Sequence, residues 1–348
     1  MRFHIDKDSG DSITGWVVLD NPSLVPRILI SMPDQDDIEL AANQERPGLK
    51  NRGLHTTGMA GFRLNEKNCR GIKSAAELAV READSGILIY QRSDPERHLR
   101  KKLFFCQLQA MPQPRVQAAL ESRFAARYYG MERHGGETLS SVIDNEHNMS
   151  VFMAGRPLML RYQPALKERG FILATVLQDP LDELAERIML CHALQARNTM
   201  SSMLDCPPDL EPLVAHLAAI DLRDEASYAA AMRSLNTPQR EALANPYLRT
   251  LACDVDERPD RFHVSSALDN LAAMDVVGLR SRFDDFKSML RDAIGVDGLG
   301  EEQPFDVPGT EEVVARLQSV REVRDLLALD IEFYAYAREA IDGALATA

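Results

Sequence analysis

The feature that most constrains the fold is the apolar run Phe171–Leu177, which Gln178–Pro180 and the helical pattern Leu184–Gln195 follow directly. A continuous apolar run of this length is typical of a strand buried on both faces. Leu103–Cys106, followed by the helical pattern Val116–Tyr129, repeats the arrangement. Two strand, loop and helix units predict an α/β domain whose parallel sheet has crossover helices and binds ligands at the carboxyl ends of its strands.

The first 95 residues have a different pattern, in which short runs with β-branched residues alternate with turns that contain proline, glycine and asparagine. This pattern predicts a small β-sandwich. A chain of 348 residues also exceeds the usual size of a single core, so we expect two domains, residues 1–95 and 96–348. The expected strands are Ile13–Leu19, Arg27–Met32, Ile38–Ala42, Gly61–Leu64 and Gly86–Tyr90, and Ala75–Ala83 is expected to be a short helix or an irregular segment.

The chain after residue 207 is expected to be mostly helical, because its apolar residues recur at helical spacing. The loop Gly295–Gly309, rich in glycine, aspartate and proline, separates the last two expected helices. The expected helices are Leu210–Ile220, Glu225–Leu235, Pro238–Ala244, Ser281–Ile294 and the long stretch Glu311–Leu345.

Composition excludes several classes of function. A net charge of −13 repels polyanions, which argues against general nucleic-acid binding and against a highly anionic ligand. The five cysteines form no CxxC pair, which argues against a disulfide framework and against a zinc site, so no metal is expected. The N-terminus lacks the pattern of a signal peptide, and no apolar run is long enough to span a membrane, so we expect a cytoplasmic protein.

Three short motifs lie in the N-terminal part, namely Gly15-Trp16, Arg46–Leu49 and Gly61-Phe62. They resemble a β module attached to some bacterial glycosyltransferases and sulfotransferases, although Gly48 stands where that module has an aspartate. Trp16 could be a platform on which a sugar stacks. A single tryptophan beside a strand is more often a core residue, and this is the interpretation that we favour.

Four segments of the second part, in the same order along the chain, resemble the bacterial carbohydrate sulfotransferase family. The resemblance implies a sulfotransferase-like parallel sheet on a P-loop-like scaffold, and a donor, 3′-phosphoadenosine 5′-phosphosulfate, bound at the ends of two strands. The four segments are Lys102–Cys106 with Ala118–Phe124, Val176–Pro180, Asn245–Leu251 and Val276–Phe286.

The residues that bind this donor in the family are largely absent here. The first loop, Gln109–Arg115, has Ala110 where the family has a lysine, Gln113 in place of a glycine, and Pro114 in place of a residue with a hydroxyl and an N–H group. In the second loop, the two arginine positions hold Gln178 and Glu183, and the serine position holds Glu186. A carboxylate near a phosphate repels it. We therefore expect no cofactor to bind, and if a donor does bind, Arg115, Gln178 and Arg249 are the candidates to hold it.

Two histidines are candidates for a catalytic base. The resemblance implies a histidine or a glutamate between the two donor loops, and His134 or His147 could hold that place. His134 lies in the reactive-looking segment Glu132–Thr138, but Phe124–Tyr129 is expected to be helical, so the strand that precedes a phosphate loop is missing. A solvated loop is therefore the simpler interpretation of this segment.

These observations favour a sulfotransferase-like protein that has lost donor binding and acts as a binding or accessory factor in surface-polysaccharide metabolism, with a glycan or a protein of that pathway as its partner. The first alternative is a divergent enzyme that still transfers a sulfuryl group, and the second is a transferase with a less charged donor. Arginines around the first loop would favour the first alternative, and a cleft without cations would exclude it. The candidate arginines are Arg92, Arg97, Arg115, Arg133 and Arg249, and the candidate lining of a cation-free cleft is Gln109, Gln113, Gln178, Glu183 and Glu186.

Overall fold

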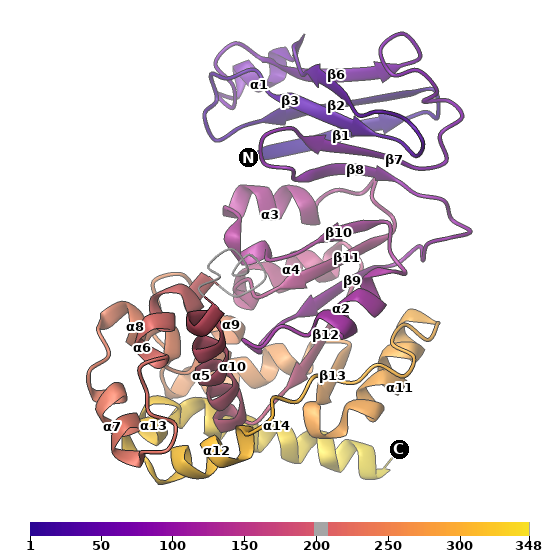
Figure 1. Ribbon diagram of the computed structural model, residues 1–348. Helices are drawn as coiled ribbons and strands as arrows, with labels where there is room; N and C mark the ends of the chain where they lie inside the picture. Colours follow the sequence, from indigo (N-terminus) through magenta and orange to yellow (C-terminus); the bar gives the residue numbers. More distant parts are fainter. Residues whose placement is uncertain (198–207, 348) are drawn as a thin grey trace. The chain divides into compact units, whose positions relative to one another are not determined.

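The structure is a computed structural model that describes residues 1–197 and 208–347 (Figure 1). No helix among these residues combines the length and the apolar character that a membrane span requires. Contacts divide the chain into two compact units whose segments alternate along the sequence, so the single boundary expected at residue 95 stays a prediction. Unit 1 comprises Met1–Leu103, Glu121–Met153 and Glu168–Phe171, and unit 2 comprises Phe104–Leu120, Ala154–Lys167 and Ile172–Ala348.

Unit 1 contains two four-stranded antiparallel sheets, which confirms the strand-rich N-terminal part (Figure 1). Buried and more exposed residues alternate along most of these strands, so each sheet turns one face towards a core. The first sheet, in the order β1-β2-β6-β5, consists of Arg2–Asp8, Ser12–Val18, Met59–Asn65 and Gln44–Glu45. The second sheet, in the order β4-β3-β7-β8, consists of Ile38–Ala41, Arg27–Ser31, Leu78–Glu82 and Leu88–Arg92.

The expectation for Ala75–Ala83 was wrong, because Leu78–Glu82 forms strand β7 in the middle of the second sheet. The side chains of Leu78, Val80 and Glu82 are buried at a period of two, which is the period of a strand. Glu82 is tolerated in this position because its carboxylate accepts hydrogen bonds from the backbone N–H groups that begin the next turn, at 3.2 and 2.6 Å.

The three motifs of the expected β module lie together in the first sheet. Gly15 lies opposite Phe62 in the β2/β6 pair, and a Cβ atom on Gly15 would lie 2.7 Å from the Phe62 ring. The Arg46 guanidinium donates to the Gly15 carbonyl at 3.1 Å, and Trp16 packs against the small cluster that contains Leu49. This packing explains the motifs as structural, and it favours Trp16 as a core residue.

A partly buried ion pair joins the two ends of the N-terminal strand region. The Arg92 guanidinium, at the end of β8, donates through Nε and Nη2 to the two carboxylate oxygens of Asp8, at 2.9 and 2.6 Å. Tyr90 donates to the same carboxylate at 2.6 Å, and Arg92 Nη1 donates to the carbonyls of Ile72 and Ala75. Burial would raise the pKa of Asp8, but the hydrogen bonds from Arg92 and Tyr90 lower it below its usual value.

Strand β8 lies at the edge of its sheet, and side chains from later in unit 1 bind the backbone groups along it. Asn148 Oδ1 accepts from Gln91 N at 2.9 Å. Asn145 and Tyr128 donate to the carbonyls of Ile89 and Leu88, at 2.7 and 3.2 Å. These side chains replace the neighbouring strand that an edge strand lacks.

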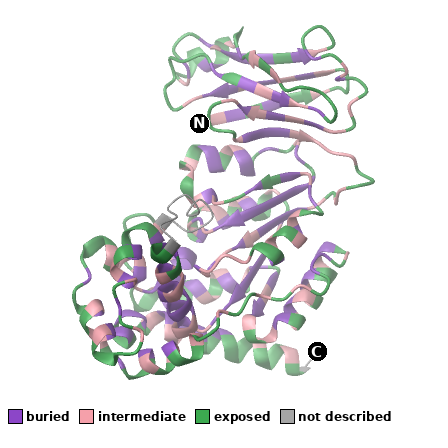
Figure 2. Cartoon of the chain, in the orientation of Figure 1, coloured by how far each residue is buried: buried purple, intermediate pink, exposed green. Residues whose placement is uncertain are grey.

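The predicted parallel sheet is present as a five-stranded sheet in the order β10-β11-β9-β12-β13, and its strands are largely buried (Figures 1 and 2). Strand β10 pairs with β11, and β12 pairs with β13, in parallel. The helix expected over Val116–Tyr129 was wrong in its second half, because α2 ends at Glu121 and Ala126–Tyr128 forms an edge strand. The five strands are Ala126–Tyr128, Val151–Gly155, Lys102–Cys106, Phe171–Leu177 and Val276–Leu279.

Helices accompany the sheet and make up most of unit 2. Helices α5, α6, α7, α8, α12 and α13 enclose one apolar core. The expected long helix Glu311–Leu345 is divided into α12, α13 and α14. Helix α10 was not predicted. Its N-cap residue is Asp260, whose carboxylate accepts from two N–H groups of the first turn. The α-helices of the described residues are α1 (Pro47–Asn51) and α3 (Gly136–Ile143) in unit 1, and α2 (Pro114–Glu121), α4 (Met159–Glu168), α5 (Pro180–Arg197), α6 (Val214–Leu217), α7 (Glu225–Arg233), α8 (Thr237–Leu243), α9 (Pro246–Ala252), α10 (Arg261–Ala272), α11 (Phe283–Ile294), α12 (Thr310–Ser319), α13 (Arg321–Leu326) and α14 (Ala328–Thr347), which lie in unit 2 except for the ends of α2 and α4.

Two helices of unit 2 cap each other. Asn245 Oδ1 accepts from the N–H groups of Leu329 and Asp330 at the start of α14, at 3.0 and 3.1 Å. The buried carboxylate of Asp330 accepts in turn from the N–H groups of Tyr247 and Leu248 in the first turn of α9, at 2.9 and 3.0 Å. Asn245 has a φ of +49°, which asparagine adopts more readily than most residues. The segment Asn245–Leu251, which carried part of the family resemblance, thus has a structural explanation.

Candidate functional site

The candidate site lies at the carboxyl ends of β9, β12 and β13, where the fold predicts ligand binding. Gln107, Gln178 and Arg280 are the first residues after these strands, and all three belong to unit 2. Gly278 precedes this end of β13, and a Cβ atom there would lie 2.5 Å from Cβ of Phe286, so glycine is needed for α11 to pack on the strand. The sequence prediction of this location rested on the alternation of strands and helices along the chain and on the family resemblance.

The first loop, after β9, is held by the chain's own side chains. The backbone N–H of Ala110 donates to Glu183 Oε1 at 3.1 Å, and Gln109 Nε2 donates to the Val176 carbonyl at 3.4 Å. Gln113 Oε1 accepts from the backbone N–H of Phe305 at 2.7 Å. A loop N–H group that could face an anionic ligand therefore already has a carboxylate as its partner.

Glu183 is part of a buried ion-pair network in α5. The Arg187 guanidinium, whose side chain is 1% exposed, donates to Glu183 Oε1 through Nη2 at 2.7 Å and through Nε at 3.2 Å. Its Nη1 atom donates to Asp209 at 3.2 Å, and Arg156 forms an ion pair with the same aspartate. Two cations and two carboxylates neutralise one another in this network.

Arg280 forms the second ion-pair group, at the end of β13. Its Nη1 atom donates to Gln178 Oε1 at 2.9 Å and to Glu186 Oε2 at 2.8 Å. Its Nη2 atom donates to the Phe305 carbonyl and, at 3.2 Å, to Asp306. The Arg280 side chain is only 8% exposed, so its donors point at these partners and not at solvent.

The acidity of the carboxylates follows from the same arrangement. Burial raises the pKa of Glu186, although Arg280 opposes the shift. Burial also raises the pKa of Asp182, and the neighbouring charge of Asp179 adds to this effect. Burial would raise the pKa of Asp209, but Arg156 and Arg187 lower it below its usual value. Burial thus outweighs the single arginine beside Glu186, whereas two arginines outweigh burial at Asp209.

Of the four residues predicted for the site, Gln178 lies directly at a strand end, because it follows β12. It is buried, its side chain binds Arg280, and its carbonyl accepts from the Tyr247 hydroxyl at 3.1 Å. Arg249 lies two residues after Tyr247 on α9 and so faces a different direction, and its Nε is buried without a hydrogen-bond partner among the described residues. Arg115 is exposed in the first turn of α2.

His134 and His147 belong to unit 1, whereas the donor-site candidates belong to unit 2. Burial lowers the pKa of His134, which follows the 3₁₀ turn Met131–Arg133. The expectation that no strand precedes the segment Glu132–Thr138 was wrong, because β10 ends at Tyr128. Helix α3, which begins in this segment, is nevertheless engaged with β1, since Ser141 Oγ accepts from the backbone N–H of Phe3 at 3.3 Å.

The arginines that line the site differ from those considered in the sequence analysis. Arg92 binds Asp8 and Arg97 binds Glu77, both within unit 1. Arg156, which directly follows β11, Arg187 and Arg280 are the cations of the two ion-pair groups described above, and none of them was predicted to have a role. The spacing of Glu183 and Arg187, four residues apart on one helix, is a signal for an ion pair that was available. Arg280 lies in the segment Val276–Phe286 that carries part of the family resemblance, but Val276–Leu279 was not predicted as a strand, so the position of Arg280 at a strand end was not foreseen.

Comparisons with known protein families, with curated proteins and with solved structures found no match to this chain.

Proposed function

We propose that this chain is a sulfotransferase-like protein whose donor site is filled by its own side chains, and that it acts as a binding or accessory factor. The observation that carries the proposal is the hydrogen bond from the Ala110 N–H group to the Glu183 carboxylate. In this arrangement, a protein carboxylate takes the place of the anionic group that such a loop would otherwise hold.

The charges around the loop support the same conclusion. Arg187 and Arg280 are both engaged by carboxylates, and neither is more than 8% exposed. A phosphosulfate donor would have to displace these carboxylates from their arginine partners and leave them buried. An unpaired buried charge costs several kcal/mol by order of magnitude, which a nucleotide would have to offset on binding.

The setting in surface-polysaccharide metabolism, with a glycan or a pathway protein as the partner, rests on the family resemblance of the sequence. The structure supports the coarser part of that resemblance, an α/β fold with a five-stranded sheet and a strand-rich N-terminal part. We extend the proposal to a protein that acts in the cytoplasm.

Calorimetric titration with 3′-phosphoadenosine 5′-phosphate, at low and at moderate salt, tests the proposal. We expect no detectable heat at millimolar nucleotide. Binding at micromolar concentration would contradict the proposal and would favour the divergent enzyme that transfers a sulfuryl group. In that case Arg115→Ala and Arg249→Ala would show whether these two arginines hold the nucleotide.

A variant with one charge removed makes the test sharper. Glu186→Gln removes a carboxylate that neutralises Arg280, while the bond from Arg280 to Gln178 remains available. If internal carboxylates fill the site, this variant should bind the nucleotide more tightly than the wild type does. Glu339→Gln removes the same charge from an exposed position on α14 and is the matched control. Equal behaviour of the two variants would show that Glu186 does not block the site.

A further inference from the structure

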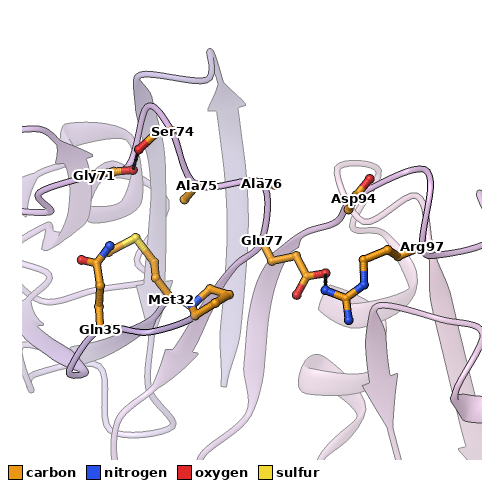
Figure 3. A pocket seen from close by; sticks show the side chains of 10 residues that line it. Met32, Gln35, Gly71, Ser74, Ala75, Ala76, Glu77, Asp94 and Arg97 are labelled. Atoms are coloured by element: carbon orange, nitrogen blue, oxygen red, sulfur yellow. Dashed lines mark hydrogen bonds and ion pairs between the residues drawn. The ribbon is translucent and has the colours of Figure 1, made fainter.

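Unit 1 contains a hollow of about 280 Å³ that the parallel sheet does not take part in (Figure 3). Three irregular segments line it: the turn Met32–Gln35 after β3, the stretch Gly71–Glu77 before β7, and residues Asp94 and Arg97 after β8. The volume is close to the lower limit of small-molecule sites. It suits one small ring and is too small for a nucleotide donor.

The wall formed by Gly71–Ala75 has no regular secondary structure, yet two charged side chains hold it in place. Both oxygens of the Glu66 carboxylate accept from backbone N–H groups, those of Gly71 and Lys73, each at 3.0 Å. From the other side, Arg92 Nη1 donates to the carbonyls of Ile72 and Ala75 at 2.6 and 3.1 Å. The backbone of the wall is thus fixed before any ligand arrives, which lowers the entropic cost of binding.

The hollow combines an apolar surface with donors and acceptors of hydrogen bonds. Met32, Ala75 and Ala76 supply the apolar part. Glu77 and Arg97, which both line the hollow, form an ion pair of 2.7 Å that is drawn as a dashed line in Figure 3. The Arg97 side chain is 67% exposed and keeps further N–H donors, while Glu77 keeps a second carboxylate oxygen.

This mixture narrows the chemical class of the ligand. The lining carries two carboxylates against one guanidinium, and Asp34, Asp36 and Asp37 surround Gln35 in sequence, so an anionic ligand would be repelled. An alkylammonium ion can only donate and would leave the donors of Arg97 unused. A hydroxyl group both donates and accepts, so a molecule with several neighbouring hydroxyl groups and an apolar ring face can use every group of the lining.

We propose that this hollow binds one neutral sugar residue. The inference rests on the proposed function in that the natural ligand would be a glycan, but its evidence is the chemistry of the hollow. The proposed function and the proposal of sugar binding can therefore fail separately. Nucleotide binding at the strand ends would contradict the proposed function and would not affect sugar binding in unit 1.

The test is saturation-transfer NMR of the full chain with glucose, galactose and N-acetylglucosamine, followed by calorimetry with the sugar that gives the strongest signal. We expect a dissociation constant in the millimolar range. Two variants should weaken binding at least tenfold: Glu77→Gln, which removes an acceptor, and Ala76→Phe, which fills an exposed part of the hollow. Glu96→Gln removes the same charge from an exposed side chain outside the lining and should bind as the wild type does.

Three results would overturn the inference. The first is no detectable binding of any of the three sugars at about 20 mM, which is roughly 20-fold above a dissociation constant of 1 mM. The second is sugar binding that both Glu77→Gln and Ala76→Phe leave unchanged, which would place the sugar elsewhere. The third is that n-butylamine or glucuronate binds the hollow and neutral sugars do not. Ala76→Phe also keeps the test valid if Glu77→Gln fails to fold, because Ala76 is exposed.

Discussion

Replacing Arg187 with methionine tests the buried ion-pair network at the strand ends. The change removes the cation that binds Glu183 at 2.7 Å and Asp209 at 3.2 Å, and methionine has a similar length without a charge. Glu183 is only 4% exposed and keeps the Ala110 N–H group as its hydrogen-bond donor. Removing one partner of such a pair costs about 3–5 kcal/mol of unfolding free energy. We expect Arg187→Met to destabilise unit 2 by that amount.

A double-mutant cycle separates the pair from its surroundings. Glu183→Gln keeps an acceptor for Ala110 and should cost about 1–3 kcal/mol, because it leaves Arg187 with weaker partners. With both charges removed, no unpaired charge remains between them, so the double variant should cost less than the sum of the single variants by at least about 1 kcal/mol. Additive costs would refute the conclusion that Glu183 and Arg187 are energetically coupled.

Two spectroscopic signals allow the unfolding of the two units to be followed separately, because helices and tryptophan are distributed unequally between them. Most of the helices belong to unit 2, so ellipticity at 222 nm during urea unfolding reports mainly on unit 2. Trp16, the only tryptophan, belongs to unit 1, and its fluorescence reports on that unit. The matched control is Arg321→Met, which breaks an arginine–aspartate pair of the same i,i+4 spacing on an exposed surface and should change the ellipticity midpoint little.

Three further predictions use the same two signals. Asp8 has a lowered pKa, so its ionisation stabilises the folded state above about pH 4, and this contribution is lost as the pH falls through the folded-state pKa. The fluorescence midpoint in urea should therefore drop on acidification. The drop should be smaller in Asp8→Asn, and it should be the same as in the wild type in the exposed control Asp11→Asn. Burial raises the pKa of Asp330 to about 7, so between about pH 4 and about pH 7 the folded state retains a proton that the unfolded state loses. The ellipticity midpoint should therefore fall as the pH rises through this range, and Asp330→Asn should reduce the slope of the fall. An unchanged slope in Asp330→Asn would refute the raised pKa of Asp330. Asn148→Ala leaves Gln91 N without its acceptor at the β8 edge and should cost about 1–3 kcal/mol by fluorescence, while Met149→Ala at the exposed neighbouring position should have little effect.

The sequence predicted the longest apolar strand correctly but missed β11, Val151–Gly155, although that strand is apolar and buried along its whole length. Phe171–Leu177 is apolar throughout and was predicted with its observed bounds as β12. Ala126–Tyr128 contains Arg127 and continues a helical pattern, and only its pairing with β11 makes it a strand. The position of the site at the strand ends was predicted because strands and helices alternate along the chain.

The residues at that position could not all be predicted. Glu183 was recognised as a substitution that repels phosphate, but its hydrogen bond to Ala110 depends on how the first loop turns towards α5. Arg280 meets Glu186 across 94 positions in the sequence, and no local pattern specifies such a pair. A sequence indicates which charges are present, whereas the folded chain determines which of them neutralise each other.

The mutual capping of α9 and α14 has a consequence for the order in which the chain can fold during its synthesis. Asn245 binds Leu329 across 84 positions, and Asp330 returns the contact to the first turn of α9. At roughly 5–20 residues per second, a ribosome needs about 4–17 s to make the chain between them. During that interval α9 has its sequence but lacks the carboxylate that caps it. Unit 2 must therefore remain incomplete for seconds after much of its apolar core has been synthesised. This is the interval in which a chaperone would bind its exposed apolar residues.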